Sequence, residues 1–232
     1  MEFMFLFIAR RDAPHGGPDG LAAMKAYSGE LASRGKLRVG APLRPESEAA
    51  RVTVRGGKPV VTDGPYAESK EVLAGFWIVD AASREEALEL ARGCPHARHG
   101  IVEVHPLEFR MAAPDPGQGL PFLYAFRAET RIQDEGRAKL REMLDFTVTL
   151  KQEGRFLETG PLAPAPLPAR LETKGGKLLV TDGPFAESRE IVGGYALLRA
   201  ASRAEAIEIA KRYPHPKWGP LELREIQFFD PT

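Results

Sequence analysis

Acidic and histidine side chains suited to proton transfer occur in matched pairs along this chain. Asp63 has a counterpart at Asp182, and His96 has one at His215, each 119 residues further on. Histidine has a pKa of about 6.5, and a carboxylate can also take up and return a proton, so the two together could act as acid and base. We therefore predict Asp63, His96, Asp182 and His215 as the catalytic candidates.

A second set of paired residues could bind a ligand. Arginines could hold an anionic group, and the charged run that follows each Asp-Gly-Pro segment could line the rim of a cleft. The predicted ligand-binding residues are Arg51, Glu68, Ser69, Arg170, Glu187 and Ser188.

Each candidate also has a structural interpretation. An aspartate before Gly-Pro can accept backbone amides within a turn. A histidine that follows a helix can cap it or bond within the core. The charged run can be a solvated face, and the two arginines can pair with carboxylates. The acids Glu103 and Glu222 are also retained as a pair.

These pairs belong to a duplication that covers most of the chain. The offset of 119 residues holds without a gap from Phe3 and Phe122 to Phe109 and Phe228. Solenoid repeats have periods of about 20–50 residues, so this period indicates two copies of a whole domain. We predict one copy at 1–112, a linker rich in proline and glycine at 113–120, and a second copy at 121–232.

Both copies predict the same order of elements: strand, helix, strand, hairpin, strand, helix and strand. This order is typical of a ferredoxin-like α+β domain with helices on one face of its sheet. A second copy can cover the other face, sheet against sheet. In the first half, the expected ranges are strands 3–9, 37–39, 74–79 and 102–104, helices 20–35 and from Ser83 onward, and a hairpin over 51–62. In the second half, they are strands 122–127, 156–158, 194–198 and 221–223, helices 136–154 and from Ser202 onward, and a hairpin that turns at 175–176.

Composition narrows the classes of function. The 32 basic and 32 acidic residues give a formal net charge of +0, which provides no electrostatic footprint for nucleic acid or an anionic membrane. The single cysteine, Cys94, favours a reducing compartment. The apolar start is far shorter than the roughly 18 residues of a spanning helix and lacks signal-peptide features, so we expect a cytoplasmic protein.

Metal and cofactor sites are not indicated. No spacing resembles a zinc site, and no glycine-rich loop opens a helix after a strand. His15, His99 and His105 have no histidine counterparts, and we expect them at the surface. Cys94 has Tyr213 as its counterpart and is expected to be a buried or incidental thiol.

The repeated segment Thr-Asp-Gly-Pro-aromatic-Ala-Glu-Ser-Lys/Arg-Glu, at 62–71 and 181–190, resembles the signature of the YCII-related family in its DGPF branch. The Pro-His pair after the second helix and the glycine-rich start of the fifth strand extend the resemblance to both halves. It implies a dimeric α/β-barrel, here formed by one chain as a pseudo-dimer. The acid/base histidine of some family members falls on Met24 and Met143, and their aspartate falls near Arg38 and Leu157. That mechanism is therefore not carried over.

Together these observations predict a protein that binds a small molecule between its two sheets, with metal-free acid/base lyase or isomerase chemistry as one outcome. The resemblance implies an alternative, a non-catalytic ligand-binding or regulatory module associated with an extracytoplasmic-function sigma factor. A third interpretation is a structural duplicate whose motif is only a turn. No cofactor, nucleic acid or membrane is expected as a partner, and self-association into a homo-oligomer is compatible with the sequence.

Overall fold

The computed structural model describes residues 1–11, 17–66, 70–128, 136–163, 168–183, 191–228 and 230–231. The predicted order of elements recurs in both halves. The first half contains β1 (Glu2–Arg10), α1 (Gly17–Ser33), β2 (Leu37–Pro42), β3 (Ala50–Arg55), β4 (Lys58–Asp63), β5 (Glu71–Asp80), α2 (Arg84–Gly93), β6 (Ile101–Pro106) and β7 (Met111–Ala112). The second contains β8 (Leu120–Ala128), α3 (Gly136–Gln152), β9 (Phe156–Pro161), β10 (Ala169–Lys174), β11 (Lys177–Asp182), β12 (Ile191–Ala200), α4 (Arg203–Arg212), β13 (Leu221–Glu225) and β14 (Asp230–Pro231). Short 3-10 turns lie at η1 (Glu46–Glu48), η2 (Pro95–Arg98) and η3 (His215–Lys217).

The strands form two seven-stranded sheets that mix the halves. One sheet has the order β11-β10-β6-β1-β5-β2-β14, and the other has the order β4-β3-β13-β8-β12-β9-β7. The four central strands of each sheet come from one half and have the ferredoxin-like order. The hairpin of each half, however, pairs with the last long strand of the opposite half, β10 with β6 and β3 with β13. The two halves therefore exchange their hairpins.

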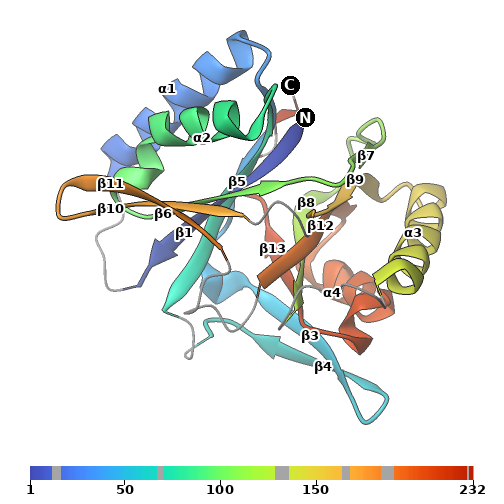
Figure 1. Ribbon diagram of the computed structural model, residues 1–232. Helices are drawn as coiled ribbons and strands as arrows, with labels where there is room; N and C mark the ends of the chain where they lie inside the picture. The colour runs from blue at the N-terminus through green and yellow to red at the C-terminus, as the bar shows by residue number, and fades with distance from the viewer. Residues whose placement is uncertain are drawn as a thin grey trace.

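The fold has four layers, with a pair of helices on each outer side and the two sheets face to face between them (Figure 1). Strand alternation produces this arrangement. On β1, Phe3 and Phe5 pack toward α1 and α2, whereas Met4 and Leu6 pack against the opposite sheet. The predicted pseudo-dimeric packing of sheet against sheet is confirmed.

Local signals in the sequence set the ends of several elements. Ser83 accepts a hydrogen bond from the amide of Glu86 at 3.2 Å, and the Glu86 carboxylate accepts one from the amide of Ala82 at 2.6 Å, so these two side chains cap the start of α2. Gly35 and Gly154, which follow α1 and α3, both have φ of 64°. This left-handed conformation is the one that glycine adopts most readily.

Within the described ranges, none of the helices combines the length and the apolar composition needed to cross a bilayer.

Candidate functional site

The two aspartates of the repeated motif anchor the exchanged hairpins. The Oδ1 atom of Asp63 accepts a hydrogen bond from Arg203 at 2.5 Å, and Asp182 pairs in the same way with Arg84. Arg84 and Arg203 are the first residues of α2 and α4, so each aspartate ties its hairpin to a helix of the opposite half. The aspartate side chains are 69% and 64% exposed. Their role in proton transfer stays a prediction.

Substitution of either aspartate with asparagine is expected to lower the free energy of unfolding by less than about 1 kcal/mol, because exposed ion pairs contribute little. Chemical denaturation of Asp63→Asn and Asp182→Asn measures this directly. A loss of more than 2 kcal/mol, by the same standard, would mean that the aspartate does more than hold an exposed pair.

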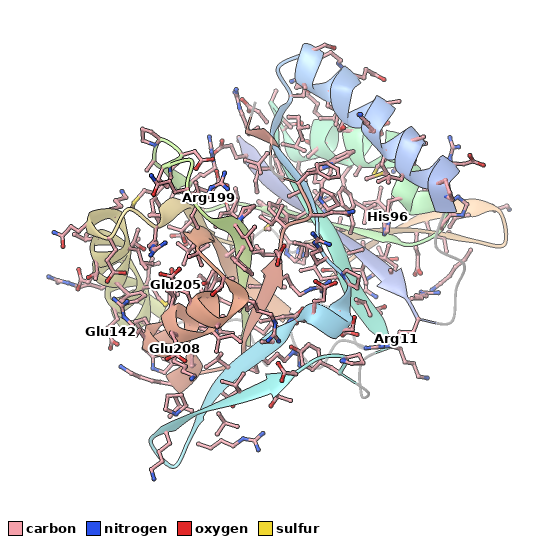
Figure 2. The ribbon with its side chains drawn as sticks, turned by 180° about the vertical axis from the view of Figure 1, so that it is seen from behind. Arg11, His96, Glu142, Arg199, Glu205 and Glu208 are labelled. Carbon is pink, nitrogen blue, oxygen red and sulfur yellow. The ribbon has the colours of Figure 1, made fainter. Side chains whose placement is uncertain are left out.

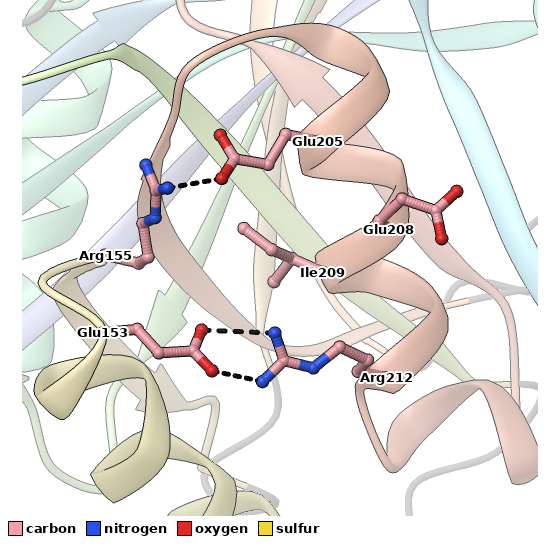
Figure 3. A pocket seen from close by; sticks show the side chains of 6 residues that line it. All are labelled: Glu153, Arg155, Glu205, Glu208, Ile209 and Arg212. Carbon is pink, nitrogen blue, oxygen red and sulfur yellow. Dashed lines mark hydrogen bonds and ion pairs between the residues drawn. The ribbon is translucent and has the colours of Figure 1, made fainter.

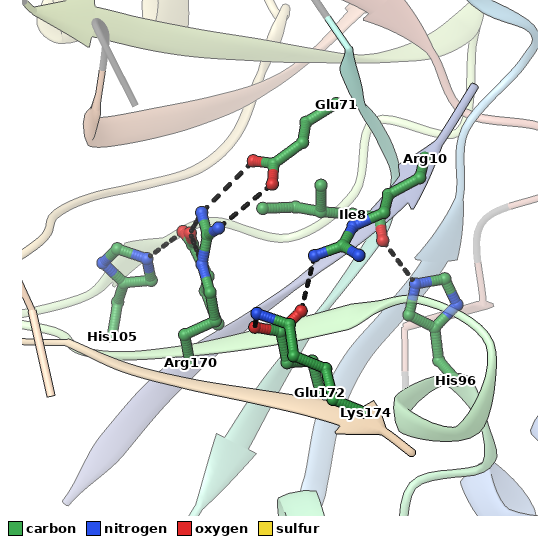
Figure 4. Close-up of polar contacts among 9 residues, drawn as sticks. Ile8, Arg10, Glu71, His96, His105, Arg170, Glu172 and Lys174 are labelled. Carbon is green, nitrogen blue, oxygen red and sulfur yellow. Dashed lines mark hydrogen bonds and ion pairs between the residues drawn. The ribbon is translucent and has the colours of Figure 1, made fainter. Parts of the chain in front are cut away.

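The two predicted histidines hold the turn after the second helix of each half to the first strand of that half. His96 Nε2 lies 3.0 Å from the carbonyl oxygen of Ile8, as Figure 4 shows, and His215 Nε2 lies 2.9 Å from that of Arg127. The His96 ring also packs on Phe7, with 5.3 Å between ring centroids. Burial lowers the pKa of His215, although its backbone hydrogen bonds oppose this shift.

His96 lies on the side of the molecule that carries α1 and α2 (Figure 2). Asp63, by contrast, is bonded to α4 of the other half. The structure therefore gives the members of the predicted acid/base pair separate partners in separate halves.

Arg170, a predicted ligand-binding residue, lies in a buried charge centre. Its guanidinium donates to Glu103 Oε1 at 2.6 Å and to both oxygens of Glu71, at 3.0 and 3.2 Å (Figure 4). His105 Nε2 lies 2.9 Å from the other oxygen of Glu103. Burial alone would raise the pKa of Glu103, but His105 and Arg170 outweigh it and hold that pKa at about 2.

Arg51, the counterpart of Arg170, lies in an equivalent charge centre of the other sheet. It donates to Glu222 at 3.1 Å, and Arg127 does so at 2.7 Å. Arg224 lies 3.4 Å from the other carboxylate oxygen. Burial by itself would raise the pKa of Glu222, but the three guanidinium groups hold it at about 2. Because Arg51 and Arg170 belong to the exchanged hairpins, each reaches a glutamate of the opposite half.

The repeated motif packs against this second centre. Gly64 lies so close to η1 that an added Cβ would be 2.1 Å from the carbonyl oxygen of Glu46. The Tyr66 ring stacks under the Arg51 guanidinium, 4.1 Å from it. Residues 62–66, the described start of the motif in the first half, therefore form a packed turn. Glu68, Ser69, Glu187 and Ser188 lie outside the described residues.

Two residues that lack a counterpart of their own type differ in outcome. His105 is buried, with 2% exposure, so the prediction that it lies at the surface is wrong. Its bond to Glu103 explains the difference, since a buried carboxylate needs a donor. Cys94 is buried as expected, and burial raises the pKa of its thiol to about 12.

A groove of about 320 Å³ lies between the end of α3 and α4 (Figure 3). Its charged side chains satisfy one another. Arg155 pairs with Glu205, and Arg212 pairs with Glu153. Glu208, which also lines the groove, pairs with Lys211 at 2.7 Å. Because these charges are already paired with one another, we do not expect the groove to bind a charged ligand.

A larger pocket, of about 450 Å³, lies between the sheets where β2 approaches β9. The segment that joins the two halves forms another of its walls. Equivalent strands contribute different side chains, because Val39 of β2 and Glu158 of β9 are counterparts in the duplication. The residues around the pocket are Glu2, Arg38, Val39, Arg110, Ala112, Ala113, Pro114, Asp115, Leu157 and Glu158.

Glu158 is the unusual group in this pocket, because it is a carboxylate that is only 4% exposed. Its Oε1 atom accepts a hydrogen bond from the Tyr195 hydroxyl at 2.6 Å, and its Oε2 atom accepts one from Arg110 Nη1 at 2.8 Å. Arg110 Nε also donates to Glu2 at 2.8 Å. Burial raises the pKa of Glu158, and the hydrogen bonds from Tyr195 and Arg110 oppose that shift only in part.

Sequence reasoning missed this site because it retained only residues whose counterparts are similar. Glu158 corresponds to Val39, and Tyr195 corresponds to Phe76. The available signal was a difference between the copies, because a glutamate occupies a position that is apolar in the other copy.

This chain has relatives among known proteins. It is 41% identical over 86 residues to an uncharacterized protein of Rhizobium meliloti (strain 1021), covering 36% of this chain and 69% of that protein. Among solved structures, an anthrone oxidase-like protein aligns over 99% of this chain and 92% of its own chain, with 7% identity and a TM-score of 0.42. The model of the YCII-related domain matches twice, over residues 1–109 and 122–230. With two such domains across most of its length, the chain belongs to the YCII-related family.

Proposed function

We propose that this protein binds a small molecule in the pocket between β2 and β9, and that Glu158 is its proton-transfer group. The observation that carries the proposal is a buried carboxyl group of raised pKa that lines a pocket of about 450 Å³. A titratable group whose pKa is shifted by desolvation and by specific neighbours, and which lies in a cleft, is a sound candidate for a functional site.

The surroundings of Glu158 suit acid/base chemistry. A carboxylate whose pKa is raised by burial is a stronger base than a solvated one. Tyr195 fixes one carboxyl oxygen, and Arg110 fixes the other. The group is therefore held in one orientation before a ligand arrives, which favours proton transfer to a bound molecule.

The Thr-Asp-Gly-Pro-aromatic segment of both halves supports placement within the DGPF branch of the family, and we propose that placement on the motif alone. On this proposal, Glu158 takes the acid/base role that the sequence suggested for Asp63 and His96. The cytoplasmic location remains a prediction from the composition.

The proposal is tested by a thermal-shift screen of small metabolites against the wild type, Glu158→Gln and Asp63→Asn. Glutamine has nearly the same shape as glutamate, and its carbonyl oxygen can accept one of the two hydrogen bonds. It also removes a carboxylate whose ionisation in the folded state is opposed by burial. We therefore expect Glu158→Gln to be as stable as the wild type at neutral pH.

A ligand whose thermal shift disappears in Glu158→Gln but persists in Asp63→Asn supports the pocket. If the wild type also converts that ligand, the glutamine variant should be slower by about 10²–10⁴-fold. Binding without conversion would favour the regulatory module associated with a sigma factor. Ligands that respond to Asp63→Asn and ignore Glu158→Gln would contradict the proposal.

A further inference from the structure

We propose that the substrate of this pocket is a small, uncharged carbonyl compound with an acidic hydrogen next to the carbonyl, and that Arg110 holds its carbonyl oxygen. This inference rests on the proposed function, because it concerns the same pocket. It adds the class of substrate and assigns a second group that contacts it.

Arg110 is placed to bind one more acceptor. Its guanidinium is a planar fork of five N–H donors. Nε donates to Glu2 and Nη1 donates to Glu158, while Nη2 makes no hydrogen bond to any part of the chain that the structure describes. The side chain is 23% exposed and lines the pocket, so it is accessible to a ligand.

The charges around the pocket favour a neutral ligand. Arg38 pairs with Asp80 at 2.6 Å, and Asp115 pairs with Arg199 at 2.5 Å. Arg110 already faces the two carboxylates Glu2 and Glu158. The pocket therefore offers no surplus of positive charge for a phosphate or a dicarboxylate, although it offers one oriented donor for a carbonyl oxygen.

The apolar residues that line the pocket can contact the carbon skeleton of the substrate. Val39 and Leu157 contribute from the two sheets, and Ala112, Ala113 and Pro114 contribute from the connecting segment. Such walls hold a small ring or chain and keep water away from Glu158, as its burial already shows.

The chemistry follows from the position of Nη2 beside Nη1. The Glu158 carboxylate accepts a hydrogen bond from Nη1 of Arg110. When the carbonyl oxygen of the substrate accepts a hydrogen bond from Nη2 of the same guanidinium, the neighbouring C–H bond lies close to that carboxylate. Glu158 takes the proton, the C–H electron pair forms a C=C bond, and the carbonyl π pair moves onto oxygen. The negative charge passes from Glu158 to the enolate oxygen, so the net charge near Arg110 does not change.

The enolate has two outcomes. Return of the proton from Glu158 to the oxygen end of the O–C=C system gives the enol, which is an isomer of the compound. Loss of a group from the next carbon completes an elimination, and Glu158 then supplies the proton to the leaving group. Arg110 stabilises the oxyanion in both cases, which is the role of a positioned donor at a site of developing charge.

The test uses 4-nitrophenol, a planar mimic of an enol whose ionised form absorbs visible light. The experiment starts from Glu158→Gln, because glutamine brings no charge that competes with the phenolate for Arg110. We expect this variant to bind the phenolate form in preference to the phenol. Adding Arg110→Met should weaken phenolate binding by at least about tenfold, the loss of about 1.4 kcal/mol expected for a charged hydrogen bond. Arg110→Lys, which keeps the charge and loses the fork, should fall between the two.

The second readout is the exchange in D2O of the cyclohexanone hydrogens next to the carbonyl, followed by proton NMR. The wild type should accelerate the exchange, and both Glu158→Gln and Arg110→Met should abolish the acceleration. Equal binding of the phenolate by variants with and without Arg110 would overturn the inference, while the pocket itself would remain supported. If no form of 4-nitrophenol binds and the metabolite screen is also empty, the proposed function itself fails.

Discussion

Replacement of Arg170 with methionine is expected to lower the free energy of unfolding by about 3–5 kcal/mol, because it leaves a buried carboxylate without its arginine. Glu103 is 8% exposed, and of its described partners only His105 would remain. Arg170 also bonds both oxygens of Glu71. The substitution therefore removes a guanidinium that is bonded to two acids.

The equivalent substitution in the other half provides the matched control. Arg51→Met leaves Glu222 with Arg127 and Arg224, so its cost is expected to be about 1.5 kcal/mol, that of one hydrogen bond to a charged group. Urea denaturation of both variants measures the difference. Adding Glu103→Gln to Arg170→Met should recover part of the loss, since the orphaned charge is then absent. Equal costs at the two positions would show that Arg127 and Arg224 do not compensate Glu222 for the loss of Arg51.

The duplication allowed most of the fold to be predicted. Local patterns such as Ser83 with Glu86, and glycines at 35 and 154, act over a few residues and are therefore legible in sequence. The choice of hairpin partner is not local. The β3–β4 hairpin could satisfy its backbone on the last strand of either half, and the two copies present nearly the same edge. Contacts such as that of Arg51 with Glu222 come from the three-dimensional arrangement, which periodicity does not encode.

Selecting residues that are similar in both copies overlooks the candidate site around Glu158. Paired residues such as Asp63 and His96 were retained because both copies need them, and the structure gives both copies the same ion pairs and backbone contacts there. A pocket at the junction of two copies has no such constraint. Its two sides can differ, and one side carries Glu158 where the other carries Val39. A function that arises after duplication is most visible where the copies differ.

The exchange of hairpins leads to the second large effect, on the isolated halves. Residues 1–112 expressed alone are not expected to form a stable folded monomer. In the whole chain, β6 pairs with β10 of the second half, and Leu171 completes the core under α1 and α2. Ala50 and Val52 of the first half are buried in the core of the second. An isolated half therefore exposes a strand edge, part of its own core and the whole inner face of its sheet.

Pairing with another half restores all three features. Two copies of residues 1–112 can exchange hairpins with each other, which would bring each Arg51 against Glu103 of its partner, as Arg170 does in the whole chain. We therefore expect a dimer whose circular dichroism and sedimentation both depend on concentration. An equimolar mixture with residues 113–232 should instead form the mixed pair, which regains the pocket that both halves line. Because Glu158 and Val39 then line one pocket again, the mixed pair alone should bind ligands found for the whole chain. A first half that is monomeric and fully folded at every concentration would show that its hairpin can turn back onto its own β6.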